Sequence, residues 1–119
     1  MDDRRFGTQV VEVPNEVRLR MRGDLDGQAE GSLGAAYDEV AALGSRRLTL
    51  DFGDVGYINS TGIALVVRLL ADARRDERAV RAVGLTAHYR EIFRITRLSD
   101  YLTIADASPA AGQHEEATR

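Results

Sequence analysis

Two neighbouring hydroxyl side chains, Ser60 and Thr61, are the residues of this chain best suited to chemistry. They lie between an apolar run at residues 48–52 and an amphipathic stretch from residue 63 to about 73, so they mark a predicted strand-to-helix junction. The N–H groups of a helix's first turn have no partners within the helix, and the peptide dipoles make that end positive. An anion is stabilised there, so one of the two hydroxyls is a candidate phosphate acceptor. The alternative is that one of them only caps the helix, its oxygen accepting a hydrogen bond from an N–H two or three residues later.

Other candidates for chemistry are weaker. Two pairs of aspartates lie beside glycine in turn-like stretches: Asp24 with Asp26, and Asp51 with Asp54. Aspartate is common in turns because it hydrogen-bonds the nearby backbone. The only histidines are His88 and His114, and no nucleophile, base and orienting group can be assembled around them. No glycine-rich phosphate loop is present. The pattern therefore predicts a protein that is not an enzyme and has no catalytic residues, no metal site and no cofactor.

The composition is that of one small globular domain. The chain has 119 residues, 44% of them hydrophobic and 29% charged, and a net charge of -3. This balance argues against direct binding of nucleic acid. There is no cysteine, no apolar run near the roughly 20 residues of a membrane helix, and no apolar segment of a secretory signal. We therefore expect a cytoplasmic protein without membrane or nucleic-acid contacts.

The elements that must position the two hydroxyls follow from the periodicity of apolar residues. Strands are predicted at 9–13, 17–22, 48–52 and 79–83, with a short extended piece at 101–104. Residues 17–22 alternate apolar and arginine side chains, so the arginines are expected on a solvated sheet face. Loops are predicted at 23–27 and 53–56.

Three helices are predicted from apolar residues spaced by three and four. The first covers residues 29–43, with Leu43 in its buried stripe, and ends at Gly44. The second runs from the junction to about residue 78. Its expected inward residues are Ile63, Val66, Val67 and Leu70. The third begins after Thr86, which is placed to cap it.

The order is β-β-α-β-α-β-α with a short final strand. It predicts an α/β fold with a mixed sheet, because a hairpin precedes the crossovers. The segments expected are a flexible N-terminus at 1–8, one domain at 9–106 and a disordered tail at 107–119.

Two separated motifs, in the context of this order, resemble one known family. The first leads from LDF at 50–52 to NSTGI at 59–63, and the second is EIFRITRL at 91–98, similar to a family helix that ends in Thr-Gly-Leu. The family is the STAS domain, and within it the bacterial anti-sigma factor antagonists. The resemblance covers roughly residues 10–106 and implies a four- to five-stranded mixed sheet with helices mainly on one face.

The resemblance also implies a function and a site. In these antagonists a serine in Asp-Ser-Ser/Thr-Gly is phosphorylated by an anti-sigma factor that is also a serine kinase of the histidine-kinase-like ATPase class. By position that serine is Ser60. The unphosphorylated protein would bind the anti-sigma factor and free a sigma factor, and phosphorylation would end the binding. The residues expected to contact the partner are Asn59, Ser60, Thr61, Gly62 and Ile63.

This chain departs from the family pattern at two positions. Asn59 replaces the acidic residue before the serine, and Arg97 replaces the glycine that follows Thr96, where a left-handed backbone is often required. Asn59 is the feature that favours a second hypothesis, a STAS domain that does not switch and serves as a scaffold or as the soluble subunit of a larger regulatory or transporter assembly. A third hypothesis, a small nucleotide-binding module, lacks a recognisable site.

Overall fold

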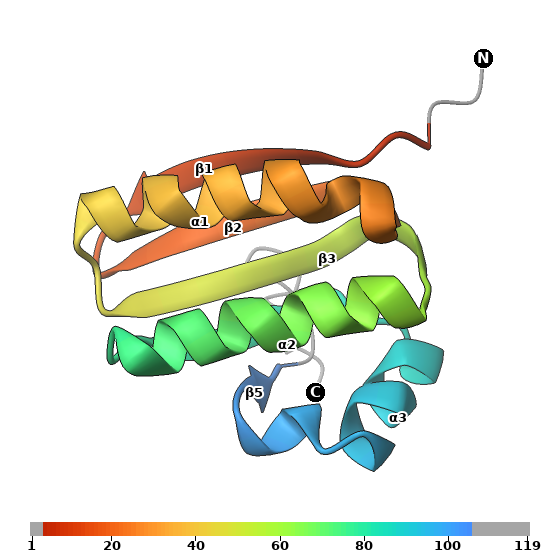
Figure 1. Cartoon of the computed structure of the whole chain (residues 1–119). Coiled ribbons are helices and arrows are strands. Elements are labelled where there is room, and N and C mark those ends of the chain that lie inside the picture. Colours follow the sequence, from red (N-terminus) through yellow and green to blue (C-terminus); the bar gives the residue numbers. More distant parts are fainter. Residues whose placement is uncertain (1–3, 106–119) are drawn as a thin grey trace, which may run out of the picture.

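The hairpin and crossovers predicted from the sequence are present in the computed structural model, which describes residues 4–105 (Figure 1). In chain order the elements are β1 (Gly7–Val13), β2 (Glu16–Leu25), a 3-10 turn η1 (Gly27–Ala29), α1 (Glu30–Leu43), β3 (Arg47–Ile58), α2 (Ser60–Arg75), β4 (Ala79–Val83), α3 (Ala87–Ile95), a second 3-10 turn η2 (Leu98–Asp100) and β5 (Thr103–Ile104). Within residues 4–105, none of the helices has the length and apolar character needed to cross a bilayer.

The five strands form one mixed sheet in the order β1-β2-β3-β4-β5. β1 pairs antiparallel with β2, and every later pair is parallel. The crossovers β2-α1-β3 and β3-α2-β4 lay α1 and α2 side by side on the same face of the sheet, and both helices start at the carboxyl ends of the strands before them (Figure 1). The predicted α/β fold with a mixed sheet and helices mainly on one face is confirmed.

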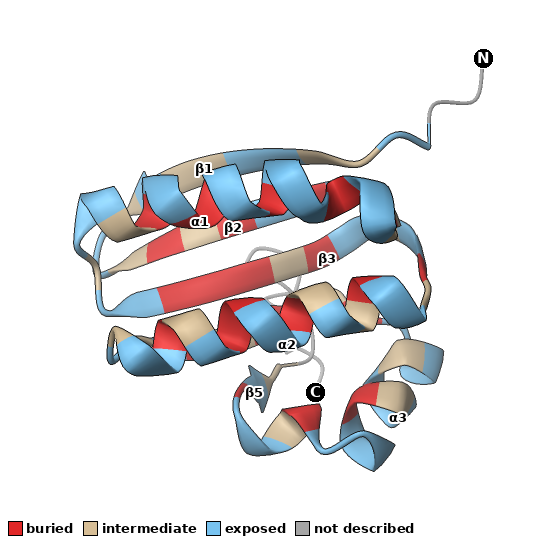
Figure 2. Ribbon diagram, viewed as in Figure 1, coloured by how far each residue is buried: buried red, intermediate tan, exposed pale blue. Residues whose placement is uncertain are grey.

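The core lies between the sheet and its helices, and the helices turn their buried stripes toward the strands (Figure 2). Along β2 the apolar residues of the alternating pattern are buried, as predicted. The α3 helix adds Phe93, which is fully buried and meets Phe52 of β3 edge-on, with the ring centroids 5.7 Å apart. The predicted caps at the end of α1 and the start of α3 are confirmed. Gly44 is left-handed at φ 78°, and the Thr86 hydroxyl accepts a hydrogen bond from the Tyr89 N–H.

The predicted loop at 53–56 is wrong, and the predicted loop at 23–27 is wrong for residues 23–25. β2 continues to Leu25 and β3 continues to Ile58, with Gly23 opposite Val55 and Leu25 opposite Ile58. Glycine and aspartate are typical of turns, but here they are paired across two strands, and Gly23 takes φ 85° at an irregular point of the register. Pairing with a distant strand has overridden the local preference.

Helix α2 also differs from its prediction. It ends at Arg75, because Glu77 adopts φ 61° and the chain turns into β4. Val67 is 47% exposed, not inward, and Leu69 and Ala73 are buried on the core side. In α1, Leu43, the last residue of the helix, is 39% exposed and not buried as predicted.

The prediction that the arginines of β2 lie on a solvated face of the sheet is only partly confirmed. Arg18 is half-buried and donates to Glu16 at 3.1 Å, and Glu16 also accepts from the buried Thr49 hydroxyl at 2.7 Å. Burial of Glu16 raises its pKa, but the hydrogen bonds from Thr49 and Arg18 and the positive charges of Arg18 and Arg81 together bring the pKa below its usual value. This face of the sheet is therefore held by a charge network, and Arg20 extends it with an ion pair to Asp51.

The segments predicted at the two ends lie partly outside the described residues. Residues 1–3, the predicted domain end at 106 and the predicted tail at 107–119 are outside them. β1 begins at Gly7, two residues before the predicted start of the domain, and the carbonyl of Arg4 accepts a hydrogen bond from the Asp24 N–H at 2.9 Å.

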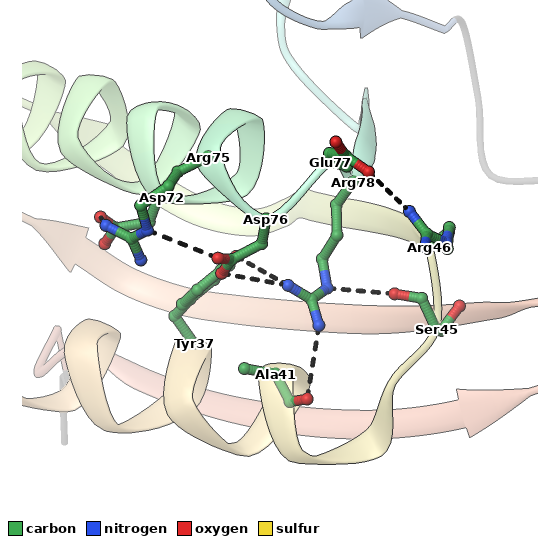
Figure 3. Close-up of polar contacts among 9 residues, drawn as sticks. All are labelled: Tyr37, Ala41, Ser45, Arg46, Asp72, Arg75, Asp76, Glu77 and Arg78. Carbon is green, nitrogen blue, oxygen red and sulfur yellow. Dashed lines mark hydrogen bonds and ion pairs between the residues drawn. The ribbon is translucent and has the colours of Figure 1, made fainter.

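A polar cluster ties the end of α2 to α1 (Figure 3). The Tyr37 hydroxyl donates to Asp76 at 2.7 Å, and the guanidinium of Arg78, of which 9% is exposed, donates to the Tyr37 hydroxyl and to the carbonyls of Ala41 and Ser45. These carbonyls lie at the end of α1, where a positive charge is favourable. The hydrogen bond from Tyr37, with the nearby arginines, lowers the pKa of Asp76.

We predict that Asp76→Asn makes the free energy of unfolding less dependent on pH in the acid range. A carboxylate with a lowered pKa in the folded state stabilises the protein above its unfolded pKa, about 4, and this contribution is lost as the pH falls through the folded pKa. The difference between wild type and variant should therefore be constant at neutral pH and shrink below about pH 4. Urea unfolding across the pH range measures it.

The control for this prediction is Asp38→Asn, at an exposed position of α1 whose side chain makes no hydrogen bond or ion pair with residues 4–105. It should leave the acid part of the profile close to that of wild type. Equal pH dependence in wild type and Asp76→Asn would contradict the role of this carboxylate.

Arg97, the residue that replaces the family glycine, lies between α3 and η2 in the left-handed conformation, with φ 69° and ψ 14°. The turn that the glycine would make is therefore retained, at the steric cost of a side chain in this region. An ion pair with Asp100 at 2.8 Å accompanies it, but it is exposed and so contributes little.

We predict that Arg97→Gly raises the free energy of unfolding by about 1 kcal/mol, because glycine adopts this conformation without strain. Arg97→Ala is the matched control, since it removes the ion pair but keeps the Cβ atom. Urea unfolding with an unchanged m-value reports the difference. If the glycine variant were no more stable than the alanine variant, the strain would be absent.

Candidate functional site

The β3–α2 junction lies at the carboxyl-terminal end of the parallel strands, where β2 and β3 end and where α1 and α2 begin (Figure 1). Parallel α/β sheets have their functional sites at this end of the strands, because the loops that follow the strands meet there. Ser60 is the first residue of α2 and Thr61 the second, and both are exposed. The structure therefore presents both candidate hydroxyls to solvent.

Neither hydroxyl caps the helix, so the capping alternative for Ser60 and Thr61 is wrong. The cap is Asn59, whose extended backbone has φ -100° and ψ -176° and whose side-chain oxygen accepts from the Gly62 N–H at 2.8 Å. Its carbonyl accepts from the Ile63 N–H at 2.9 Å. Asparagine is among the best capping residues, and it stands one position before the helix. The Ser60 and Thr61 hydroxyls make no hydrogen bond with the residues that the structure describes.

Gly62 is buried and has a structural role in this junction. A Cβ atom added to it would overlap the carbonyl oxygen of Leu25 at the end of β2. Gly62 was expected to contact a partner, but the backbone that approaches it belongs to this chain. The glycine thus lets α2 start against β2.

The five residues expected to contact a partner are exposed to different degrees. Ser60 and Thr61 are exposed, Asn59 and Ile63 are half-buried, and Gly62 is buried. Ile63 packs against the core. A docking partner would therefore reach the two hydroxyls directly and the other three residues little or not at all.

Two exposed residues outside the predicted set of five extend this surface along α2. Ala64 and Val67 follow Ser60 at the fourth and seventh positions, which places them on the same side of the helix. Val67 is 47% exposed. The spacing from Ser60 was available in the sequence, but Val67 was assigned to the core because it is apolar.

The junction is held on both sides by hydrogen bonds. The Asn59 N–H donates to the carbonyl of Leu25 at 3.3 Å, and the Ile58 N–H donates to the hydroxyl of Tyr89 in α3 at 2.9 Å. Nothing in the local sequence indicates that the hydroxyl of Tyr89 reaches another element.

The remaining candidates make local contacts. Asp26 accepts from the Gln28 N–H at the start of η1, as expected of an aspartate in a turn, whereas Asp51 accepts from the Gly53 N–H within β3. His88 is exposed on α3, and His114 lies outside the described residues. Within residues 4–105, no three histidine or carboxylate side chains lie close enough together to hold a metal ion.

Comparison with known proteins identifies the family of this chain. The family model described as "Mlab, STAS domain" matches residues 8–104. The chain belongs to the STAS domain family. This STAS domain is 31% identical, over 84 residues, to BtrV of Bordetella bronchiseptica, a protein provisionally named an anti-sigma factor antagonist; the match covers 71% of this chain and 69% of BtrV.

Solved structures of anti-sigma factor antagonists share the fold. One from Mycobacterium paratuberculosis has a TM-score of 0.73 at 17% identity, covering 94% of each chain. The antagonist SpoIIAA in its unphosphorylated form has a TM-score of 0.69 at 16% identity, covering 95% of this chain and 100% of SpoIIAA. The phosphorylated form of the Bacillus protein SpoIIAA has a TM-score of 0.68 at 18% identity, with the same coverage. At these identities the likeness concerns the fold alone.

We predict that Gly62→Ala lowers the free energy of unfolding by about 3 kcal/mol, because the new methyl group must displace α2 from the end of β2. Gly56→Ala is the matched control, since a Cβ atom there meets nothing within 4 Å. Urea unfolding of the two variants makes the comparison. A Gly62→Ala protein as stable as the Gly56→Ala protein would show that the contact with Leu25 does not constrain the junction.

Proposed function

We propose that this STAS protein is an anti-sigma factor antagonist that acts in the cytoplasm. Unphosphorylated, it binds an anti-sigma factor that is a serine kinase of the histidine-kinase-like ATPase class, and a sigma factor is released. Phosphorylation of Ser60 ends the binding. The names of its relatives support the antagonist role, and the geometry around Ser60 supports the switch.

The main support for the proposal is that Ser60 is exposed and its hydroxyl makes no hydrogen bond within the described residues. Asn59 supplies the cap, and Gly62 supplies the packing against β2. A kinase can therefore modify Ser60 without first breaking a hydrogen bond of the fold. This separation is what a reversible modification site requires.

The start of α2 can also hold a phosphate without unfolding. The N–H groups of Ser60 and Thr61 have no hydrogen-bond partner among residues 4–105, and they lie at the positive end of a long helix. A phosphate adds about -1.5 to -2 charges, which that end of the helix stabilises. The phosphorylated protein should therefore keep its fold.

The same charge is unfavourable for a docked partner. The exposed surface beside Ser60 continues into Ala64 and Val67, two apolar side chains that a partner would cover. A doubly charged group at the edge of such a contact must lose water on docking, and this costs free energy unless the partner supplies matching charges. Phosphorylation thus changes binding more than it changes folding.

A second function is favoured by Asn59. The family has an acidic residue there, and an aspartate would cap α2 as well as asparagine does. Asparagine therefore preserves the helix start but removes a charge beside the acceptor, as expected for a STAS domain that serves as a constant scaffold or as a soluble subunit of a larger assembly. Phosphorylation distinguishes the two proposals.

We predict that the protein gains the mass of one phosphate group when incubated with ATP and the kinase-type anti-sigma factor recovered on the immobilised wild-type protein. Ser60→Ala should abolish the gain. Ser60→Asp should weaken binding to that anti-sigma factor by at least about tenfold, which corresponds to about 1.4 kcal/mol. Mass spectrometry and a titration of binding give the two measurements.

Two controls separate Ser60 from its surroundings. Thr61→Ala should still be phosphorylated, because Thr61 is the neighbouring exposed hydroxyl and is not the proposed acceptor. Val67→Glu should weaken binding without removing the acceptor. Absence of phosphate on the wild type, together with unchanged binding by Ser60→Asp, would favour the scaffold function.

A further inference from the structure

The second half of β3 has a neighbouring strand on only one side. On the β4 side the ladder ends with Asp51 opposite Val83, whereas on the β2 side it continues to Leu25 opposite Ile58. From Phe52 to Ile58, one edge of β3 therefore lacks a strand. Backbone groups on such an edge need another partner if they are not to be left unpaired.

The segment that follows β4 lies along this open edge. A Cβ atom on Gly84 would lie 2.5 Å from the backbone nitrogen of Gly53, so the turn after β4 touches β3 there. In α3, the ring of Phe93 meets Phe52 at an interplanar angle of 86°. The helix is thus anchored to β3 through a fully buried side chain.

Tyr89 makes the third contact, at the end of β3. It lies one turn before Phe93 and so on the same side of α3. Its backbone is fixed by the cap, since its N–H donates to the Thr86 hydroxyl at 3.2 Å. Its own hydroxyl accepts a partly buried hydrogen bond from the Ile58 N–H at 2.9 Å. A side chain thus takes the place that a strand would have.

We propose that Tyr89 is a positioning residue for Ser60. Ile58 is two residues before Ser60, and the intervening Asn59 is held on the opposite side by the carbonyl of Leu25. Of these two hydrogen bonds, the one that the Tyr89 hydroxyl accepts is the one whose acceptor is a side chain. Helix α3, which is not part of the β3–α2 connection, thereby fixes the position of the Ser60 hydroxyl. This inference rests on the proposed function, because it assigns Tyr89 a role in phosphorylation of Ser60.

Loss of the Tyr89 hydroxyl should loosen the junction without unfolding the domain. Tyr89→Phe keeps the ring, the helix cap and the anchor at Phe93, and removes only the acceptor of the Ile58 N–H. The junction then spends less of its time in the geometry that a kinase requires. Docking along Ala64 and Val67 is unaffected, so the loss falls on kcat and not on KM.

The experiment compares wild type, Tyr89→Phe and Tyr101→Phe. Tyr101 is 55% exposed and its hydroxyl makes no hydrogen bond with residues 4–105, so its variant is the same chemical change at a position without the contact. Amide hydrogen exchange is followed by NMR at Ile58 and Asn59, with the amides of β4 as the internal reference. Phosphorylation by the recovered kinase-type anti-sigma factor gives kcat and KM.

For Tyr89→Phe we expect faster exchange at Ile58 and Asn59, unchanged exchange in β4, kcat lower by about fivefold and KM within about twofold of wild type. Tyr101→Phe should match wild type. Unchanged local exchange, unchanged kcat, or faster exchange throughout β4 would each overturn the positioning role. Absence of phosphate on the wild-type protein would overturn the proposed function itself, and exchange at Ile58 would then still show whether the hydrogen bond to the Tyr89 hydroxyl holds the junction.

Discussion

The close approach of Gly62 to the carbonyl oxygen of Leu25 determines where α2 begins. Only a residue without a Cβ atom lets the helix start against the end of β2. Since β2 and β3 end side by side, the same approach brings the Asn59 N–H to the carbonyl of Leu25 and leaves Ser60 on the outside. The exposure of Ser60 thus depends on a contact in which it takes no part.

The rest of the helix is held at its far end by a different kind of contact. The cluster of Tyr37, Asp76 and Arg78 joins the end of α2 to α1 through hydrogen bonds and ion pairs (Figure 3). A helix fixed at both ends presents the side chains between them in a constant arrangement. If Ser60 is phosphorylated as proposed, this rigidity means that the modification changes the charge of the surface and not its shape.

The division of labour among neighbouring residues explains how one position can be free to change. Asn59 caps, Gly62 packs, and Ser60 does neither. The proposed modification would therefore add charge where the fold has the least to lose. The replacement of the family's acidic residue by Asn59 keeps the cap and alters only the charge beside Ser60, so it bears on the partner and not on the stability of the domain.

Local chemistry was sufficient to predict much of this protein. The element order, the mixed sheet, the caps at Gly44 and Thr86 and the position of Ser60 at a helix start all follow from periodicity and capping preferences over a few residues. Tertiary structure decided what depends on partners distant in the chain. Because β2 and β3 pair with each other, both strands continue over glycine and aspartate residues that are typical of loops. In the folded protein Val67 is exposed and Gly62 is buried, and the Tyr89 hydroxyl of α3 accepts a hydrogen bond from the Ile58 N–H. These outcomes could not be predicted from the sequence, because the atom that each residue meets is supplied by an element that only the folded sheet places beside it.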